Sequence, residues 1–199
     1  MAINRVVRAA LKALSYNEYD IKENLQRHRN FVNLTRRHIL KPLFKTCDFK
    51  IGSINHNIPV RVFFPEANAD CPVLLFFHGG GWVAGNIDSY NKVCTNMTRL
   101  TNHKVVSVDY RLAPENPFPI GLEDCYGAAK AFITNEEINN KEVVLIGDSA
   151  GGNLSAALSL LARDRKEFKV NKQILIYPST YNDHTGNSPF KSVIENGTD

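Results

Sequence analysis

Short apolar runs alternate with longer amphipathic stretches along the second part of this chain. Four runs have the length and composition of buried strands: residues 72–79, 104–110, 142–147 and 173–178. Three stretches between them have helical spacing: residues 88–100, 122–134 and 153–165. Because parallel strands need crossover connections, which helices usually supply, this order predicts an α/β fold. We expect a mostly parallel sheet with helices on both faces.

The N-terminal part has a different pattern. Helices are predicted over residues 3–14 and 21–39, and two short strands over residues 49–53 and 58–65. The second helix is rich in Arg and His, which is also typical of contacts with anionic membranes or nucleic acids. Interspersed acidic residues favour a solvated basic face on a helix that packs against the main domain. At the start of the 88–100 helix, Asp88 or Ser89 is the expected N-cap.

Composition limits the partners and the location of the protein. The net charge of +4 is too small to indicate a nucleic-acid partner. No apolar run reaches the roughly 18 to 20 residues of a membrane span. A signal-peptide core is interrupted by three basic residues, Arg5, Arg8 and Lys12. Without CxxC spacing, free thiols are expected at Cys47, Cys71, Cys94 and Cys125. We therefore expect a cytoplasmic protein.

A serine lies in a glycine-rich turn between a predicted strand and a predicted helix. The motif G-x-S-x-G is formed by Gly147, Asp148, Ser149, Ala150 and Gly151. In this context small residues allow a sharp turn that exposes the hydroxyl, and the helix N-terminus favours developing negative charge. Ser149 is therefore the candidate nucleophile, and it needs a base to take its proton.

A second glycine-rich motif follows the first buried strand. It consists of His78, Gly79, Gly80, Gly81 and Trp82. Because glycine has no side chain, its backbone N–H can approach a ligand and donate to the oxyanion of a tetrahedral intermediate. Taken alone, the motif is also compatible with a flexible turn or a phosphate loop, although no G-K-[ST] of a P-loop follows. With the serine motif in frame, we predict an oxyanion hole formed by N–H groups of this glycine run and the N–H of Ala150, just after the nucleophile.

Three motifs in this order resemble the hormone-sensitive-lipase-like branch of the α/β-hydrolases: HGGGW, VDYRLAPE at residues 108–115, and GDSAGG. The resemblance implies a carboxylesterase that acts on a small-molecule carboxylic ester, with short acyl chains expected and no metal or organic cofactor. It carries the nucleophile onto Ser149 and the oxyanion hole onto the N–H groups of Gly80, Gly81 and Ala150. It makes residues 1–45 a helical cap segment and residues 46–199 the α/β-hydrolase core. It gives a structural role, anchoring the loop after the second run, to Asp109, Arg111 and Glu115.

The end of the chain departs from that family. The family's triad acid and histidine follow the serine on loops after later strands. Here no D-P-x-x-D-like segment follows residue 178, and no histidine follows His184. We therefore expect an incomplete core that lacks its general base, with His184 as the alternative base because a triad is defined by geometry rather than sequence order. Residues 173–178 would then be an edge strand, which favours self-association or pairing with a missing C-terminal segment.

Three other interpretations stay open. One is a basic protein that associates with surfaces through residues 21–45, which has little support in the sequence. A non-catalytic small-molecule-binding protein, or an inactive fragment of the same fold, would keep the pocket without the histidine. A peptidase or thioesterase would differ from an esterase only in the leaving group, which the sequence does not distinguish.

Overall fold

The computed structural model describes residues 21–36, 45–52, 56–66, 71–135 and 142–180. The chain divides into two units. One comprises Met1–Leu25 and Thr180–Asp199, and only residues 21–25 and 180 of it are described. The other, Gln26–Ser179, contains the sheet. The predicted helix over residues 3–14 and the candidate base His184 lie outside the described residues.

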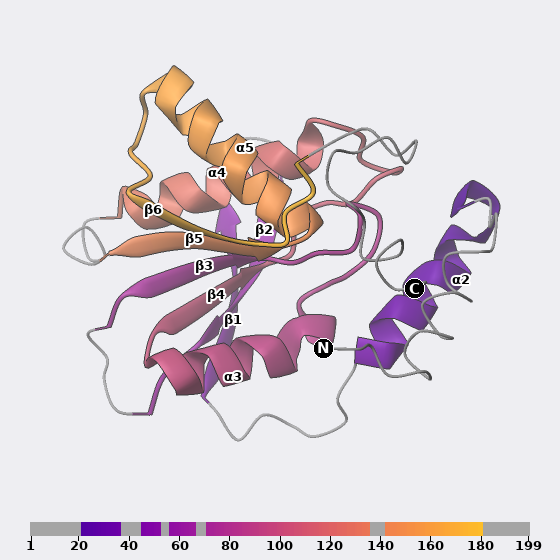
Figure 1. The fold of residues 1–199 in the computed structure, drawn as a ribbon, viewed down its shortest axis with the longest axis horizontal. Coiled ribbons are helices and arrows are strands. Elements are labelled where there is room, and N and C mark those ends of the chain that lie inside the picture. Colours follow the sequence, from indigo (N-terminus) through magenta and orange to yellow (C-terminus); the bar gives the residue numbers. More distant parts are fainter. Residues whose placement is uncertain (1–20, 37–44, 53–55, 67–70, 136–141, 181–199) are drawn as a thin grey trace, which may run out of the picture. The chain divides into compact units, whose positions relative to one another are not determined.

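Six strands form one sheet in this part of the chain (Figure 1). They are β1 (Thr46–Gly52), β2 (Asn57–Phe63), β3 (Val73–Phe77), β4 (Lys104–Val108), β5 (Val143–Asp148) and β6 (Lys172–Ile176). Their spatial order is β1-β2-β4-β3-β5-β6. The β1–β2 and β2–β4 pairs are antiparallel, whereas β3 pairs in parallel with β4 and β5, and β5 with β6. The predicted, mostly parallel sheet is thus confirmed.

Helices cover both faces of the sheet, as predicted (Figure 1). The described helices are α2 (Ile21–Arg36), the short 3-10 helix η1 (Asp88–Tyr90), α3 (Asn91–Thr101), α4 (Ile120–Ile133) and α5 (Ala150–Arg165). Alternate residues of β3 divide between the two faces, because successive strand residues point in opposite directions. Leu75 packs in the cluster that includes α4 and α5, and Phe76 packs in the cluster that includes α3. All five β3 residues are buried, which explains the unbroken apolar run VLLFF.

The start of α3 differs from the prediction. Neither Asp88 nor Ser89 is the N-cap of an α-helix; both belong to η1, and α3 begins at Asn91. Instead, Asn86 lies just before the turn, and its Oδ1 accepts a hydrogen bond from the Ser89 N–H at 2.8 Å. In return, the Ser89 Oγ accepts the Asn86 N–H at 3.0 Å. This reciprocal pair gives the N–H groups of Asn86 and Ser89 side-chain partners, so the helical segment opens with a tight 3-10 turn before α3.

Helix α5 begins three residues earlier than predicted, at Ala150 instead of residue 153. The prediction treated the glycines after Ser149 as part of a turn, but Gly151 and Gly152 are helical and buried. A Cβ atom on Gly151 would collide with the carbonyl oxygen of Phe77 at the end of β3. The glycine therefore allows the helix to approach the strand closely, and it is not needed there for an unusual backbone conformation.

The strand order places two loops next to each other at the carboxyl ends of the parallel strands. From β3 the chain passes to β4 on one side, and from β4 it crosses to β5 on the other side of β3. The connections that leave the carboxyl ends of β3 and β5 therefore diverge. In open α/β sheets, ligands bind at such a switch point. The loop after β3 carries HGGGW, and the turn after β5 carries Ser149.

Candidate active site

Ser149 lies in the turn between β5 and α5, with φ 52° and ψ −116°. A positive φ is uncommon for a residue with a side chain and stores strain, which the surroundings must hold in place. Two backbone hydrogen bonds do so, one from the last residue of β6 and one from the segment after it. The Ser149 N–H donates to the Ile176 oxygen at 2.9 Å, and the Ser149 oxygen accepts the Ser179 N–H at 3.1 Å. Ser149 is half-buried.

The HGGGW loop makes a tight turn directly after β3. Gly80 has φ 133°, and a Cβ atom there would collide with the Ala84 carbonyl. The Gly80 oxygen accepts the N–H groups of Val83 at 3.2 Å and Ala84 at 3.0 Å, which closes the turn. Glycine is required at this position both for its backbone conformation and for space. Gly81 and Trp82 follow with φ 62° each.

Three backbone N–H groups of the two motifs are available for a ligand. Among the described residues, none accepts a hydrogen bond from the N–H of Gly80, Gly81 or Ala150. Ala150 is the first residue of α5, where N–H groups have no partner within the helix. These are the donors that the sequence predicted for an oxyanion hole.

Asp148 connects the two motifs. Its Oδ1 accepts the Gly79 N–H at 2.9 Å, and its Oδ2 accepts the hydroxyls of Tyr90 at 2.8 Å and Tyr177 at 3.2 Å. One buried side chain therefore ties the loop after β3, helix η1 and the segment after β6 to the residue before Ser149. Sequence reasoning had named Asp148 only as part of the motif, and it missed both tyrosines because nothing in their local sequence marks them.

His78 supports the loop from the core. It is fully buried, and its ring stacks on Tyr110 with centroids 4.4 Å apart. The Tyr110 hydroxyl donates to the His78 backbone oxygen at 2.7 Å. Burial raises the pKa of Tyr110 well above its usual range, so this hydroxyl keeps its proton. His78 is therefore a buried residue that holds the start of the HGGGW loop against the core.

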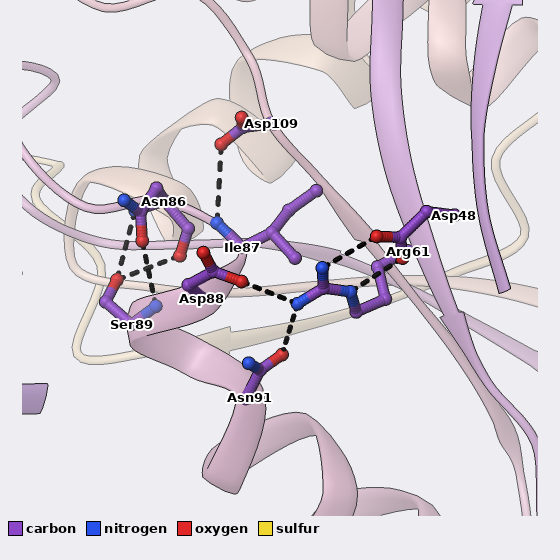
Figure 2. Close-up of polar contacts among 8 residues, drawn as sticks. All are labelled: Asp48, Arg61, Asn86, Ile87, Asp88, Ser89, Asn91 and Asp109. Carbon is purple, nitrogen blue, oxygen red and sulfur yellow. Dashed lines mark hydrogen bonds and ion pairs between the residues drawn. The ribbon is translucent and has the colours of Figure 1, made fainter. Parts of the chain in front are cut away.

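The loop after β4 is anchored by the polar residues of the VDYRLAPE motif. The Asp109 Oδ1 accepts the Ile87 N–H at 3.3 Å, which Figure 2 shows. Burial raises the pKa of Asp109. Arg111 binds both carboxyl oxygens of the buried Asp124, at 2.7 and 2.8 Å. Both contacts agree with the expected anchoring role.

A pocket of about 450 Å³ lies beside this loop. Its walls come from the HGGGW loop, the loop after β4 and the first turns of α5. Trp82, Phe118 and Leu154 are among its mainly apolar lining residues. Ser149 does not line it, but Asn153, one helical turn further along α5, does. Its volume lies in the range of small-molecule sites, roughly 300 to 1,000 Å³.

The described histidines do not pair with Ser149. None of them accepts a hydrogen bond from the Ser149 hydroxyl. The His78 ring instead contacts the Gly79 backbone oxygen and stacks on Tyr110. Within the same residues there is no group of three or more His, Cys, Asp or Glu side chains that could hold a metal ion. None of the helices described is long and apolar enough to cross a bilayer.

Comparison with known proteins identifies the family of this fold. Residues 74–197, more than half of the chain, match the family model described as the alpha/beta hydrolase fold. Carboxylic ester hydrolase LipN of Mycobacterium tuberculosis is 37% identical over 161 residues, which are 75% of this chain and 42% of that protein. An arylesterase of Saccharolobus solfataricus is 37% identical over 145 residues, 71% of this chain and 47% of that protein.

The fold is also similar to that of a solved esterase structure. The hyperthermophilic esterase from the archaeon Pyrobaculum calidifontis has a TM-score of 0.74 and 33% identity. The match covers 90% of this chain and 60% of that one. The present chain spans less than half the length of the two curated relatives above. With the matching family model, the motifs and the sheet order in agreement, the chain belongs to the α/β-hydrolase family, in the hormone-sensitive-lipase-like branch of its esterases.

Proposed function

We propose that the protein hydrolyses carboxylic esters, with Ser149 as the nucleophile. The observation that carries this proposal is the position of Ser149: a strained backbone between β5 and α5, beside a loop whose N–H groups have no acceptor in the described chain. The names of the relatives, carboxylic ester hydrolase and arylesterase, support the same reaction class.

In the proposed reaction, the Ser149 Oγ attacks the ester carbonyl carbon while a base takes the hydroxyl proton. The carbonyl π electrons move onto the oxygen, and the N–H groups of Gly80, Gly81 and Ala150 stabilise that charge. The C–O bond to the alcohol then breaks, the alcohol leaves with a proton, and an acyl-serine forms. Water adds to the acyl group, which releases the acid and restores Ser149.

The apolar pocket supports a small ester with a hydrocarbon or aromatic group. We infer short acyl chains, as the resemblance implied. We also propose that residues 1–45 act as a cap on the core of residues 46–199, and the hydrogen bonds that Arg29 makes to the core support this. A cytoplasmic location is proposed because the four cysteines are free thiols, three of them buried, as expected in a reducing compartment.

A fluorophosphonate probe tests the nucleophile. In a form of the protein that supplies the general base, we expect labelling at Ser149, and Ser149→Ala should abolish it because the probe reacts with an activated serine. Ser159→Ala is the matched control, since Ser159 lies on the same helix and hydrogen-bonds only within the described α5 and β6 region. Labelling that persists in Ser149→Ala would refute the assignment.

The base of the reaction is the next residue to assign. His184 is the alternative base from the sequence. If His184 is the general base, His184→Ala should lower the hydrolysis of p-nitrophenyl acetate. If it is not, wild type and His184→Ala should both show only the residual turnover that an oxyanion hole supports without a base. A probe-inert protein that still binds apolar esters would favour the non-catalytic binding protein instead.

A further inference from the structure

Arg29 joins helix α2 to the core through four hydrogen bonds. Its Nε donates to the Val83 carbonyl at 2.6 Å, and its Nη2 donates to the Ala113 carbonyl at 2.8 Å. Its two terminal nitrogens also bind both carboxyl oxygens of Glu115, each at 2.7 Å. The Arg29 side chain is only 15% exposed, although Glu115 is largely open to solvent. The carbonyl bonds are therefore the more protected part of this contact.

The two carbonyl groups belong to two different walls of the pocket. Val83 lies in the loop after β3, next to Trp82, and Ala113 lies in the loop after β4; all three line the cavity. The walls are already joined where the Ala113 N–H donates to the Trp82 oxygen at 2.9 Å. Arg29 adds a second connection, because one guanidinium binds a carbonyl of each wall.

This contact falls between two points where side chains of the core bind the segment after β3. Asp148 binds the loop at Gly79, and Asp109 binds the chain at Ile87. Between these points lie Gly80 and Gly81, whose N–H groups are the proposed oxyanion donors. A displacement of Val83 would be passed to them through the turn that the Val83 N–H closes on the Gly80 oxygen.

We propose that Arg29 is a positioning residue that sets the conformation of residues 80–83 and, with it, the shape of the pocket. Helix α2 thereby controls the loop without contributing to the reaction. The catalytic consequence of this role rests on the proposed esterase function; the conformational role does not.

The residue type matters for this role. The guanidinium is planar and presents five donors in a fixed fork, so it binds two carbonyl groups and a carboxyl group at once. Lysine carries its three donors on one atom and does not reproduce this geometry. Arg29→Lys therefore keeps the charge but loses the connection between the walls.

Trp82 is the reporter for the test, because it is the only tryptophan in the sequence and lies in the loop itself. We expect Arg29→Ala and Arg29→Lys to shift its fluorescence emission and to increase its quenching by acrylamide, as the loop opens to solvent. Arg27→Ala is the matched control: Arg27 is an exposed arginine on the same helix, and its loss should leave the Trp82 signal unchanged.

A purely structural arginine would give a different result. If Arg29 only anchored α2, Arg29→Ala would lower the melting temperature and leave Trp82 quenching in the folded protein as in Arg27→Ala, which would overturn the proposal. A wild-type signal in Arg29→Lys would also overturn it, and this variant keeps the test decisive if Arg29→Ala does not fold. No turnover is needed, so failure of Ser149 labelling and failure of this inference are separate outcomes.

Discussion

At the scale of single residues, close contacts between backbone segments determine the shape of the site. Ser149 has a strained backbone, held by hydrogen bonds to the end of β6 and to the segment after it. Glycines allow the neighbouring segments to meet: Gly80 within its turn, and Gly151 where α5 passes the end of β3. Such positions tolerate no added atom, since the obstacle in each case is another backbone carbonyl.

Gly151→Ala tests this packing. The new Cβ would collide with the Phe77 carbonyl, so helix α5 or strand β3 must shift. We expect the free energy of unfolding, measured by urea titration, to fall by about 1 to 3 kcal/mol, the usual cost of overpacking. Gly52→Ala is the control, because a Cβ on Gly52 meets nothing within 4 Å. Equal stability of the two variants would contradict the close approach.

At the scale of secondary-structure elements, Arg61 joins the antiparallel side of the sheet to the start of α3 (Figure 2). Its Nε and Nη2 bind both carboxyl oxygens of Asp48 at 2.6 and 2.7 Å. Its Nη1 binds Asp88 at 2.7 Å and Asn91 at 2.8 Å. Asp48 lies opposite Arg61 in the β1–β2 register, whereas Asp88 and Asn91 lie on η1 and α3. One side chain thus fixes three elements near the end of the HGGGW loop.

Acid titration of Arg61→Gln tests this connection. The hydrogen bonds from Arg61 lower the pKa of Asp48 below its ordinary value of 3.8. Because the folded pKa is the lower one, the stabilisation is present above pH 3.8 and is lost as the pH falls through the folded pKa. We expect the wild-type free energy of unfolding to fall in this acid range, and that of Arg61→Gln to fall less.

The control for this experiment is Arg99→Gln, which changes an exposed arginine on α3. It should follow the wild-type pH dependence. At neutral pH the free energy of unfolding of Arg61→Gln should be about 1 to 2 kcal/mol lower than that of wild type. The expected loss is smaller than for a buried pair, because Asp48 is exposed and solvent screens its interaction with Arg61. If the free energy of unfolding fell equally with pH in wild type and Arg61→Gln, Arg61 would not lower the pKa of Asp48.

At the scale of the whole molecule, β6 is the last strand of the described sheet. Its inner side pairs with β5, and among the described residues no strand pairs with its outer side. The apolar side chain of Ile174 is 46% exposed. A strand edge with unpaired N–H and C=O groups is a template for pairing with another chain. Among the described residues, β6 thus has the edge position that the sequence analysis expected for residues 173–178.

We expect the 199-residue protein to self-associate through this edge. Size-exclusion chromatography with light scattering should show a mass that rises with concentration. Ile174→Lys should suppress the rise, because a charge on an edge strand opposes pairing. Leu100→Lys is the matched control, since Leu100 is 76% exposed at the end of α3, away from β6. A concentration-independent monomer would contradict this prediction.

The sequence by itself determined the elements and the two motifs. Apolar periodicity depends on local backbone geometry, so the strand VLLFF and the helices around the sheet could be located from residue types alone. The same holds for Ser149 and the glycines at positions 79–81, because turns and close approaches demand particular residue types. The strand order could not be derived this way, since it depends on which distant segments pair.

Only the tertiary structure decided how the site is held together. Asp148 meets Tyr90 and Tyr177, and Arg29 meets the carbonyl oxygens of Val83 and Ala113, across long separations in the chain. A backbone carbonyl is present in every residue, so no sequence pattern marks the ones that an arginine will bind. Likewise, a tyrosine hydroxyl finds its partner only after the sheet has brought the strand ends together. The chemistry of the site is local in the sequence, whereas its geometry depends on contacts that exist only in the folded chain.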